Sequence, residues 1–323
     1  MSTLRVRLFG ALDLERDGRQ LDRFSSRKAR DLFAYLAVHR RGGHGRDQLA
    51  GIFWGDSSDD RARHALNTTL WRINRVLGAR DDNPRQNGCL RITAQHIAFN
   101  TAADVWLDVA EFESRCRAAE QSKDVAERIA LYEQAISFYR GDLLPDSYED
   151  WCVLERERLQ SLYVRALSRV MGYHAQRGDN AVAIDCGMRI LGCDQLQEEV
   201  HRDLIQLYLD SGQPAAALKQ YRICEELLRE ELAVAPAPET RALLTRIMGV
   251  THTAPNVAAR PIGTPVIRRI DVASMAAQLD ELSALCDTLR AGLAQAHELL
   301  ARINREAAAH SVSGGPRLRE AVG

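Results

Sequence analysis

The sequence contains no run of about 18 apolar residues, the minimum for a helix that crosses a membrane. Its first residues reach charged side chains before any long apolar core, so they do not form a secretion signal. Aromatic residues make up only 6% of the chain, and its wealth of alanine, leucine, arginine and glutamate favours helices. At 323 residues the chain has room for two or three domains. We therefore expect a mainly helical, cytoplasmic protein with no membrane contact.

The residue patterns that usually mark an enzyme are also missing. The seven cysteines are scattered without a C-x-x-C pair, so we expect free thiols in a reducing cytosol. No G-x-x-x-x-G-K-[ST] loop occurs, and none of the three lysines follows a glycine, which argues against a nucleotide-hydrolysing module. His39 and His44 flank a glycine-rich turn, but neither has a nearby nucleophile or metal-ligand spacing. The sequence thus predicts a protein that is not an enzyme and that binds no cofactor and no metal.

The formal net charge of −1 hides an uneven distribution along the chain. Residues 1–107 contain 18 lysines and arginines against 12 aspartates and glutamates, whereas the remaining residues contain 25 against 32. A basic end on an acidic body is typical of proteins in which one end binds a polyanion such as nucleic acid.

Hydrophobic periodicity in the N-terminal third changes from a period of two to a helical period and back. Segments 4–9 and 12–16 alternate apolar and polar side chains and predict short strands, with Asp17-Gly18 as a turn between strands. Three helical segments follow, the first capped by Ser25 or Ser26, and a second hairpin closes the region. We expect the helices at Ser26 to about Arg40, Arg46–Trp54 and Asp59–Leu77, and the hairpin at Leu90–Phe99. This order predicts a winged helix-turn-helix DNA-binding domain over residues 1–106.

The third of these helices has two different faces. Its apolar stripe consists of Ala62, Leu66, Leu70, Ile73 and Leu77. The opposite side carries His64, Asn67, Thr68, Trp71, Arg72 and Arg75. No acidic residue occurs between Arg61 and Arg75, whereas an ordinary solvated face mixes acids among its bases. We interpret this side as the surface that reads double-stranded DNA, and a merely solvated face is the alternative.

Side-chain chemistry suggests a role for each polar residue on the reading side. Asn67 suits adenine, and Arg72 suits guanine or a phosphate. His64 and Thr68 can reach base edges or methyl groups, and Trp71 can pack on a thymine methyl, a sugar or the wing. The expected phosphate clamps are Arg27, Lys28, Arg61 and Arg75. Thr93 and His96, at the tip of the second hairpin, are expected to touch the adjacent minor groove.

The middle of the chain is amphipathic helix with an internal repeat. Residues 163–196 align with residues 197–230 at a period of 34, so that Gly178 lies over Gly212 and Ala183 over Ala217. A helix, a glycine turn and a second helix at this period are typical of tetratricopeptide repeats. We therefore expect residues 107–249 to form an all-α, tetratricopeptide-like domain.

The C-terminal part divides into three predicted segments. Residues 250–267 carry three prolines and read as a linker, residues 268–310 as a long helix, and residues 311–323 as a disordered tail. Apolar residues recur along the helix at alternating spacings of three and four, which predicts a coiled-coil seam. The seam includes Met275, Leu279, Leu282, Leu289, Leu293, Leu300 and Ile303. Homodimerisation through this seam is the favoured interpretation, and a helix that folds back on the repeats is the alternative.

Together these segments resemble the Streptomyces antibiotic regulatory protein family of activators over about residues 4–248. The helix DRARHALNTTLWRINRVLG is similar to the recognition helix of that family, in which Arg63 and Arg72 take expected places. VWLDVAEFES and YRGDLLPDSYEDWCVLERERL resemble its bacterial transcriptional activator domain. Two residues depart from the pattern: Trp71 replaces a small polar residue, and Asn74 stands where a basic residue is common, which predicts a weaker phosphate grip.

The resemblance implies a nucleoid-associated transcription activator that contacts RNA polymerase through the loop at residues 55–60 and through the repeats. The sequence alone does not separate an activator from a repressor. A tetratricopeptide-type interaction scaffold, or a ligand-sensing repressor, stays open as the alternative.

Overall fold

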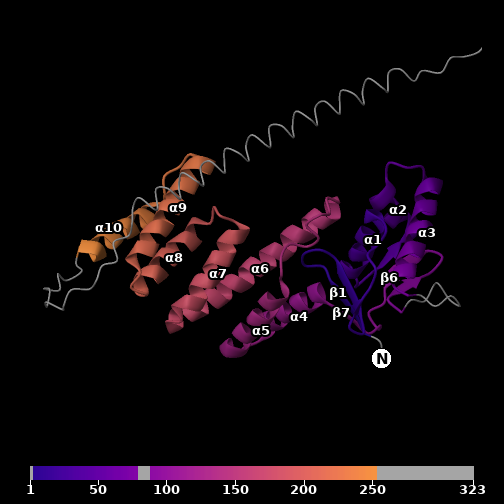
Figure 1. The fold of residues 1–323 in the computed structure, drawn as a ribbon, viewed down its shortest axis with the longest axis horizontal. Coiled ribbons are helices and arrows are strands. Elements are labelled where there is room, and N and C mark those ends of the chain that lie inside the picture. Colours follow the sequence, from indigo (N-terminus) through magenta and orange to yellow (C-terminus); the bar gives the residue numbers. More distant parts are fainter. Residues whose placement is uncertain (1–2, 79–87, 253–323) are drawn as a thin grey trace, which may run out of the picture. The chain divides into compact units, whose positions relative to one another are not determined.

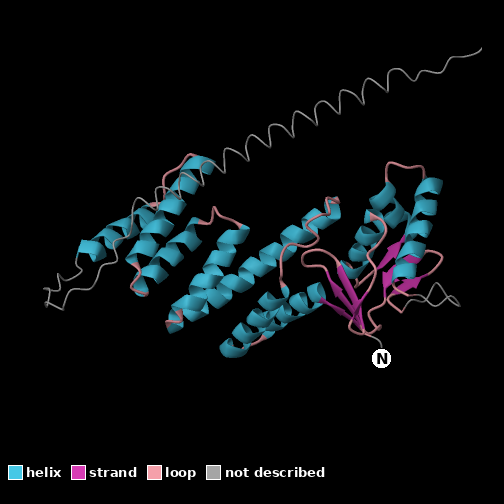
Figure 2. Cartoon of the chain, viewed as in Figure 1, coloured by secondary structure: helices cyan, strands magenta, loops and turns pink. Residues whose placement is uncertain are grey.

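The computed structural model describes residues 3–78 and 88–252 (Figure 1). It is mainly helical with a small N-terminal α+β part, as the sequence predicts (Figure 2). The predicted coiled-coil seam and tail, and the linker beyond residue 252, lie outside the described residues. The last described helix, α10, runs from Pro238 to His252 and so includes the first three residues of the predicted linker.

The chain begins with a small mixed sheet. Its strands are β1 (Leu4–Arg7), β2 (Asp13–Arg16), β3 (Arg19–Gln20) and β7 (Val105–Leu107), in the order β3-β2-β1-β7. Asp17 and Gly18 have φ angles of 51° and 80°, the left-handed conformation of a tight hairpin turn between β2 and β3. The parallel pairing of β1 with β7 brings together residues about 100 positions apart, and local periodicity gives no sign of it.

Three helices and a second sheet follow. The helices are α1 (Arg27–Val38), α2 (Arg46–Trp54) and α3 (Asp59–Val76), and the sheet has the order β4 (Gly43–Gly45), β6 (His96–Phe99), β5 (Leu90–Ile92). The Ser26 hydroxyl accepts a hydrogen bond from the Ala29 amide at 3.2 Å and caps α1, as predicted. Strand β4 was not predicted. Its glycines were expected only to end a helix, but in the structure they pair with β6.

The core of this region forms between the inner faces of α1, α3 and the second sheet. Phe33, Leu66 and Ile73 are fully enclosed, and Phe33 packs its ring at 6.3 Å from Phe99 of β6. Burial of these side chains fixes which side of α3 faces inward, at about 1.5–3 kcal/mol for each large apolar residue.

The rest of the described chain is a succession of helices, each packed on the next (Figure 1). These are α4 (Asp108–Gln121), α5 (Val125–Phe138), α6 (Asp150–Arg177), α7 (Asn180–Cys193), α8 (Glu198–Asp210), α9 (Pro214–Leu232) and α10. Gly178 and Gly212, which the repeat aligns, both adopt left-handed φ angles, 78° and 68°, at the turns that follow α6 and α8. The predicted alternation of helix, glycine turn and helix is therefore present.

Two acidic side chains of α4 contact residues of the N-terminal region. The carboxylate of Asp108, at the start of α4, accepts hydrogen bonds from the Leu8 and Phe9 amides just beyond β1, at 2.8 and 2.9 Å. Glu113 of α4 ion-pairs with Arg40, which follows α1, at 2.9 Å and with Arg158 of α6 at 2.6 Å. Burial by itself raises the pKa of Glu113, but hydrogen bonds from Arg158 and Arg40 outweigh it, so the pKa is lowered from 4.5.

The lowered pKa of Glu113 predicts a stability that depends on pH. A carboxyl group of this kind stabilises the fold above its unfolded pKa and loses that contribution as pH falls through its folded pKa. We expect Glu113→Gln to lower the free energy of unfolding at pH 7 by about 1–3 kcal/mol. Urea titrations should show this difference shrinking as the pH falls below about 4. The matched variant Glu157→Gln, on the exposed side of α6, should change neither value.

Close packing of α7 predicts opposite effects for two glycines of that helix. A Cβ atom on Gly187 would lie 2.8 Å from Leu204 Cδ2 and 3.2 Å from Met171 Cε, whereas one on Gly192 would meet nothing within 4 Å. Gly187→Ala should therefore destabilise the fold by about 1–2 kcal/mol through overpacking. Gly192→Ala should stabilise it by about 0.5–1 kcal/mol, since alanine loses less backbone entropy. Equal shifts in thermal unfolding would contradict this packing of α7 against α6 and α8.

Candidate nucleic-acid interface

Charged residues at both ends of helix α3 stabilise it, in addition to the apolar stripe that packs into the core. Asp59 and Asp60 lie in its first turn and Arg75 in its last, where each charge complements the helix dipole. After Leu77 the chain turns at Gly78, which has a φ of 63°. These features fix the start and end of the helix and present one long side of it to solvent.

The two predicted faces of α3 are present. Ala62, Leu66, Leu70, Ile73 and Leu77 are all buried. The exposed residues of the helix include Arg61, Arg63, His64, Asn67, Trp71, Arg72 and Arg75, while Thr68 is half-buried and donates to the His64 carbonyl at 3.0 Å. Asn74 is buried, at 7% exposure. Its position therefore does not belong to the exposed side of α3, and the lack of a basic residue there leaves the charge of that side unchanged.

Trp71 is the most exposed apolar side chain of α3, at 57%. The Arg75 guanidinium lies 5.8 Å from the centre of its ring, within the range of a cation–π contact. An aromatic ring with so much exposed surface provides a flat apolar contact next to a cation, which suits a surface that packs on nucleotides.

Arg46, the first residue of α2, connects α3 to the tip of the β5–β6 hairpin. Its guanidinium donates to the Thr93 carbonyl at 3.1 Å and to the side-chain oxygen of Asn67, and its amide donates to the Gln95 carbonyl at 3.0 Å. The sequence pattern predicts no role for Arg46 beyond the start of a helix. Its position depends on β4, which directs the chain toward β6 just before α2 begins, and β4 was not predicted.

The contact with Arg46 changes what Asn67 can offer to a ligand. A guanidinium has only donors, so its bond to Asn67 uses one of the two lone pairs of the side-chain oxygen and leaves the NH₂ group as a donor. The predicted pairing with adenine needs both the oxygen and the NH₂ group. Arg46 therefore competes with adenine for the Asn67 oxygen, while the NH₂ group can donate to an acceptor.

Some polar groups at the tip of the β5–β6 hairpin hydrogen-bond to one another. The Thr93 hydroxyl donates to the His96 carbonyl at 3.0 Å and accepts from the His96 amide at 2.9 Å, which closes the turn. The His96 side chain is exposed. A recess of about 410 Å³ separates this tip from α3 and is lined by Arg46, Asn67, Trp71 and Ile92, among others.

The basic residues predicted to bind DNA differ in whether they are already paired. Within residues 3–78 and 88–252, Arg61 and Arg72 form no ion pair, whereas Arg63 pairs with Asp47 of α2 at 2.8 Å. Arg27 is exposed at the start of α1. Lys28 lies elsewhere: its Nζ pairs with Glu149, just before α6, at 2.9 Å and lies 5.8 Å from the Phe53 ring. The structure therefore gives Lys28 a contact with the helical region instead of a place beside α3.

Within residues 3–78 and 88–252, no cluster of three His, Cys, Asp or Glu residues could hold a metal ion, and no helix is long and apolar enough to span a membrane. The six cysteines in this part are free, and five of them are buried.

Known proteins resemble this chain both in one domain and over most of its length. The family model of the bacterial transcriptional activator domain matches residues 107–248. The regulatory protein AfsR of Streptomyces coelicolor is 25% identical over 248 residues, which cover 76% of this chain and 24% of AfsR. The transcriptional regulatory protein MoaR1 of Mycobacterium tuberculosis is 25% identical over 253 residues, which cover 75% of this chain and 78% of MoaR1.

A solved structure shares the fold. EmbR of Mycobacterium tuberculosis, in complex with a low-affinity phosphopeptide, matches with a TM-score of 0.59 and 22% identity, over 77% of this chain and 66% of that one. The chain spans about a quarter of the length of AfsR and most of MoaR1. Residues 107–248 match the bacterial transcriptional activator domain, and the chain is similar to the regulators AfsR and MoaR1.

Proposed function

We propose that this protein is a sequence-specific transcription activator of the nucleoid, whose residues 1–106 form a winged helix-turn-helix that binds double-stranded DNA. The observation that carries this proposal is the exposed, acid-free side of α3 between Arg61 and Arg75. A major groove admits one helix and displays a distinct pattern of donors and acceptors for each base pair. The β5–β6 hairpin, joined to α3 by Arg46, is the wing and lies against the neighbouring backbone or minor groove.

Each exposed side chain of α3 takes a role from its contacts. Arg72, which has no ion pair within the described residues, donates to guanine or to a phosphate. Asn67 donates from its NH₂ group to a base acceptor, because Arg46 holds its oxygen. Arg61 and Arg75 contact phosphates, which position the protein without specifying sequence. Arg63 adds a phosphate contact only when Asp47 releases it.

Activation requires a second contact, with RNA polymerase. We propose that the loop between α2 and α3 and the activator domain at residues 107–249 make it, because the chain shares that domain with known regulators. Dimerisation through the predicted seam in residues 268–310 would place two reading helices on one operator.

A protein-interaction scaffold is the second candidate function. A groove of about 680 Å³ lies along α6 and α8 and is lined by acidic side chains that include Glu198, Glu199, Asp203 and Asp210. Such a groove suits a basic protein segment. A gel shift with the promoter region of the protein's own gene separates the two functions, because a pure scaffold would not retard DNA.

Two arginines of α3 should lose DNA affinity in different ways. Arg72→Ala should cost about 1–3 kcal/mol and remove the preference for one base pair. Arg61→Ala should weaken all sequences alike and reduce the slope of log affinity against log salt, about −5 for roughly six phosphate contacts, by about one. Fluorescence anisotropy with specific and scrambled duplexes measures both, and Arg169→Ala, exposed on α6, is the control. A salt slope near zero would remove the electrostatic basis of the proposal.

Arg46 should set the base preference of Asn67. Arg46→Ala frees the Asn67 oxygen, so selection of binding sites from a random pool should show a changed base at the position that Asn67 contacts. In an Asn67→Ala background the same substitution should leave that position unchanged, because the two residues act as a pair. If Arg46→Ala lowers affinity evenly and alters no position in the selected sites, Arg46 is only a phosphate contact.

A further inference from the structure

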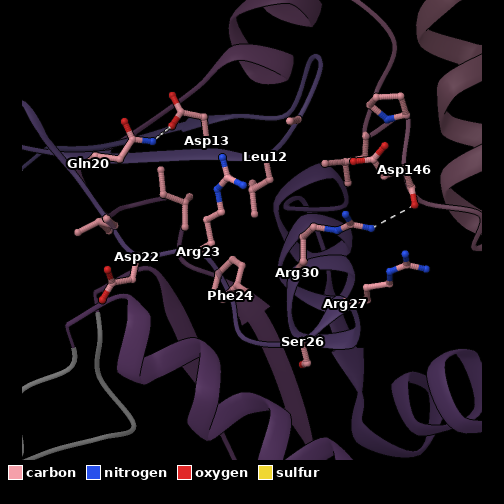
Figure 3. Close-up of a pocket in the computed structure, with 15 residues that line it drawn as sticks. Leu12, Asp13, Gln20, Asp22, Arg23, Phe24, Ser26, Arg27, Arg30 and Asp146 are labelled. Carbon is pink, nitrogen blue, oxygen red and sulfur yellow. Dashed lines mark hydrogen bonds between the residues drawn. The ribbon is translucent and has the colours of Figure 1, made fainter.

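A cavity of about 330 Å³ lies between the N-terminal sheet, the start of α1 and the segment that precedes α6 (Figure 3). Leu12, Leu14 and Phe24 contribute apolar surface from the sheet side, and Leu144 and Pro145 contribute it from the helical region. Its volume is in the range of small-molecule sites, which are mostly apolar with a few polar groups. No role proposed for α3 or the β5–β6 hairpin uses this cavity, although Arg27 of its lining is also one of the expected phosphate contacts.

Three arginines surround the apolar surface: Arg23, Arg27 and Arg30. Arg30 is held in place, since it donates to Asp31 at 2.9 Å and to the Asp146 carbonyl at 3.4 Å. Within residues 3–78 and 88–252, neither Arg23 nor Arg27 forms an ion pair. In Figure 3 the Arg30 side chain lies between Arg23, which is beside Leu12 and Phe24, and Arg27, which comes from the start of α1.

The acidic residues of the lining do not neutralise this group. Asp13 already accepts from Arg7 at 2.6 Å and from Gln20. Asp22 lies away from Arg27 and Arg30 at the other side of the view in Figure 3. Asp146 contributes its backbone carbonyl to Arg30. Two guanidinium groups therefore remain available beside an apolar surface, which is the arrangement that binds a carboxylate with an apolar body.

We propose that this cavity is a binding site for a small amphiphilic carboxylate. The carboxylate pairs with Arg23 or Arg27, the two arginines of the lining without an ion pair among the described residues, and the apolar body lies against Leu12, Phe24 and Leu144. Because the walls come from both sides of the junction, an occupant contacts α1, whose region carries α3, and the activator domain at once. The site is thus placed for an effector that links a metabolite to the regulator.

The test titrates the full chain with butyrate, hexanoate and octanoate by isothermal calorimetry. Each added CH₂ group that is buried should tighten binding roughly fourfold, so affinity should rise in that order. Octanamide, which has the same apolar body without the charge, should bind at least about tenfold more weakly than octanoate. Absence of saturable binding for all three acids up to about 1 mM, a weak affinity on the usual scale, would overturn the proposal.

A pair of double variants locates the site. Arg23→Gln/Arg27→Gln should weaken octanoate at least about tenfold, while the matched pair Arg169→Gln/Arg222→Gln, on exposed faces of α6 and α9, should not. Thermal unfolding of each variant confirms that it is folded. Octanoate should also slow amide hydrogen exchange in residues 21–30 and 143–147. Equal affinities of the two double variants, or protection elsewhere only, would show that the acid binds at another place.

DNA affinity is measured separately for the same proteins. Loss of octanoate binding with unchanged DNA affinity assigns Arg23 and Arg27 to the cavity alone. Loss of DNA affinity in the double variant together with unchanged octanoate binding would overturn the cavity proposal and assign these arginines to phosphates. The two proposals therefore fail independently.

Discussion

The carboxylate of Asp108 is the contact on which the arrangement of the two regions depends. It stands where β7 ends and α4 begins, and it accepts the Leu8 and Phe9 amides beyond β1 and the Val109 amide of its own helix, at distances of 2.7–2.9 Å. Burial raises the pKa of this carboxyl to about 6. One side chain thus satisfies buried amides from the N-terminal sheet and from the first helix of the activator domain, groups that are costly to leave without partners.

Further contacts continue the same junction away from Asp108. Arg40 reaches Glu113, Lys28 reaches Glu149, and the Tyr35 ring packs edge-on against Trp151 at 5.3 Å. Helix α1 therefore has two roles: it forms the core beneath α3 and it contacts the activator domain. Helix α1 thus connects the junction to the core beneath α3, and the proposed carboxylate cavity lies at the start of that helix.

The proposed recognition of DNA depends on a second arrangement, in which Arg46 joins α3 to the hairpin. This contact links the helix to the hairpin tip in the free protein and uses the side-chain oxygen of Asn67. Preorganisation of this kind lowers the entropy lost on binding. Trp71 and Arg75 are exposed on the same side of α3, where the proposed contact with DNA would form.

Patterns within single segments determined the positions of α2 and α3, the cap of α1, the β5–β6 hairpin and the glycine turns of the helical repeat, because each depends on side chains a few residues apart. The same periodicity separated the exposed from the buried side of α3. Only the tertiary structure decided the pairing of β1 with β7, the short strand β4, the contact of Arg46 with Asn67 and Thr93, and the pairing of Lys28 with Glu149. These contacts join residues 21 to 121 positions apart, and periodicity carries no information about which distant side chains meet.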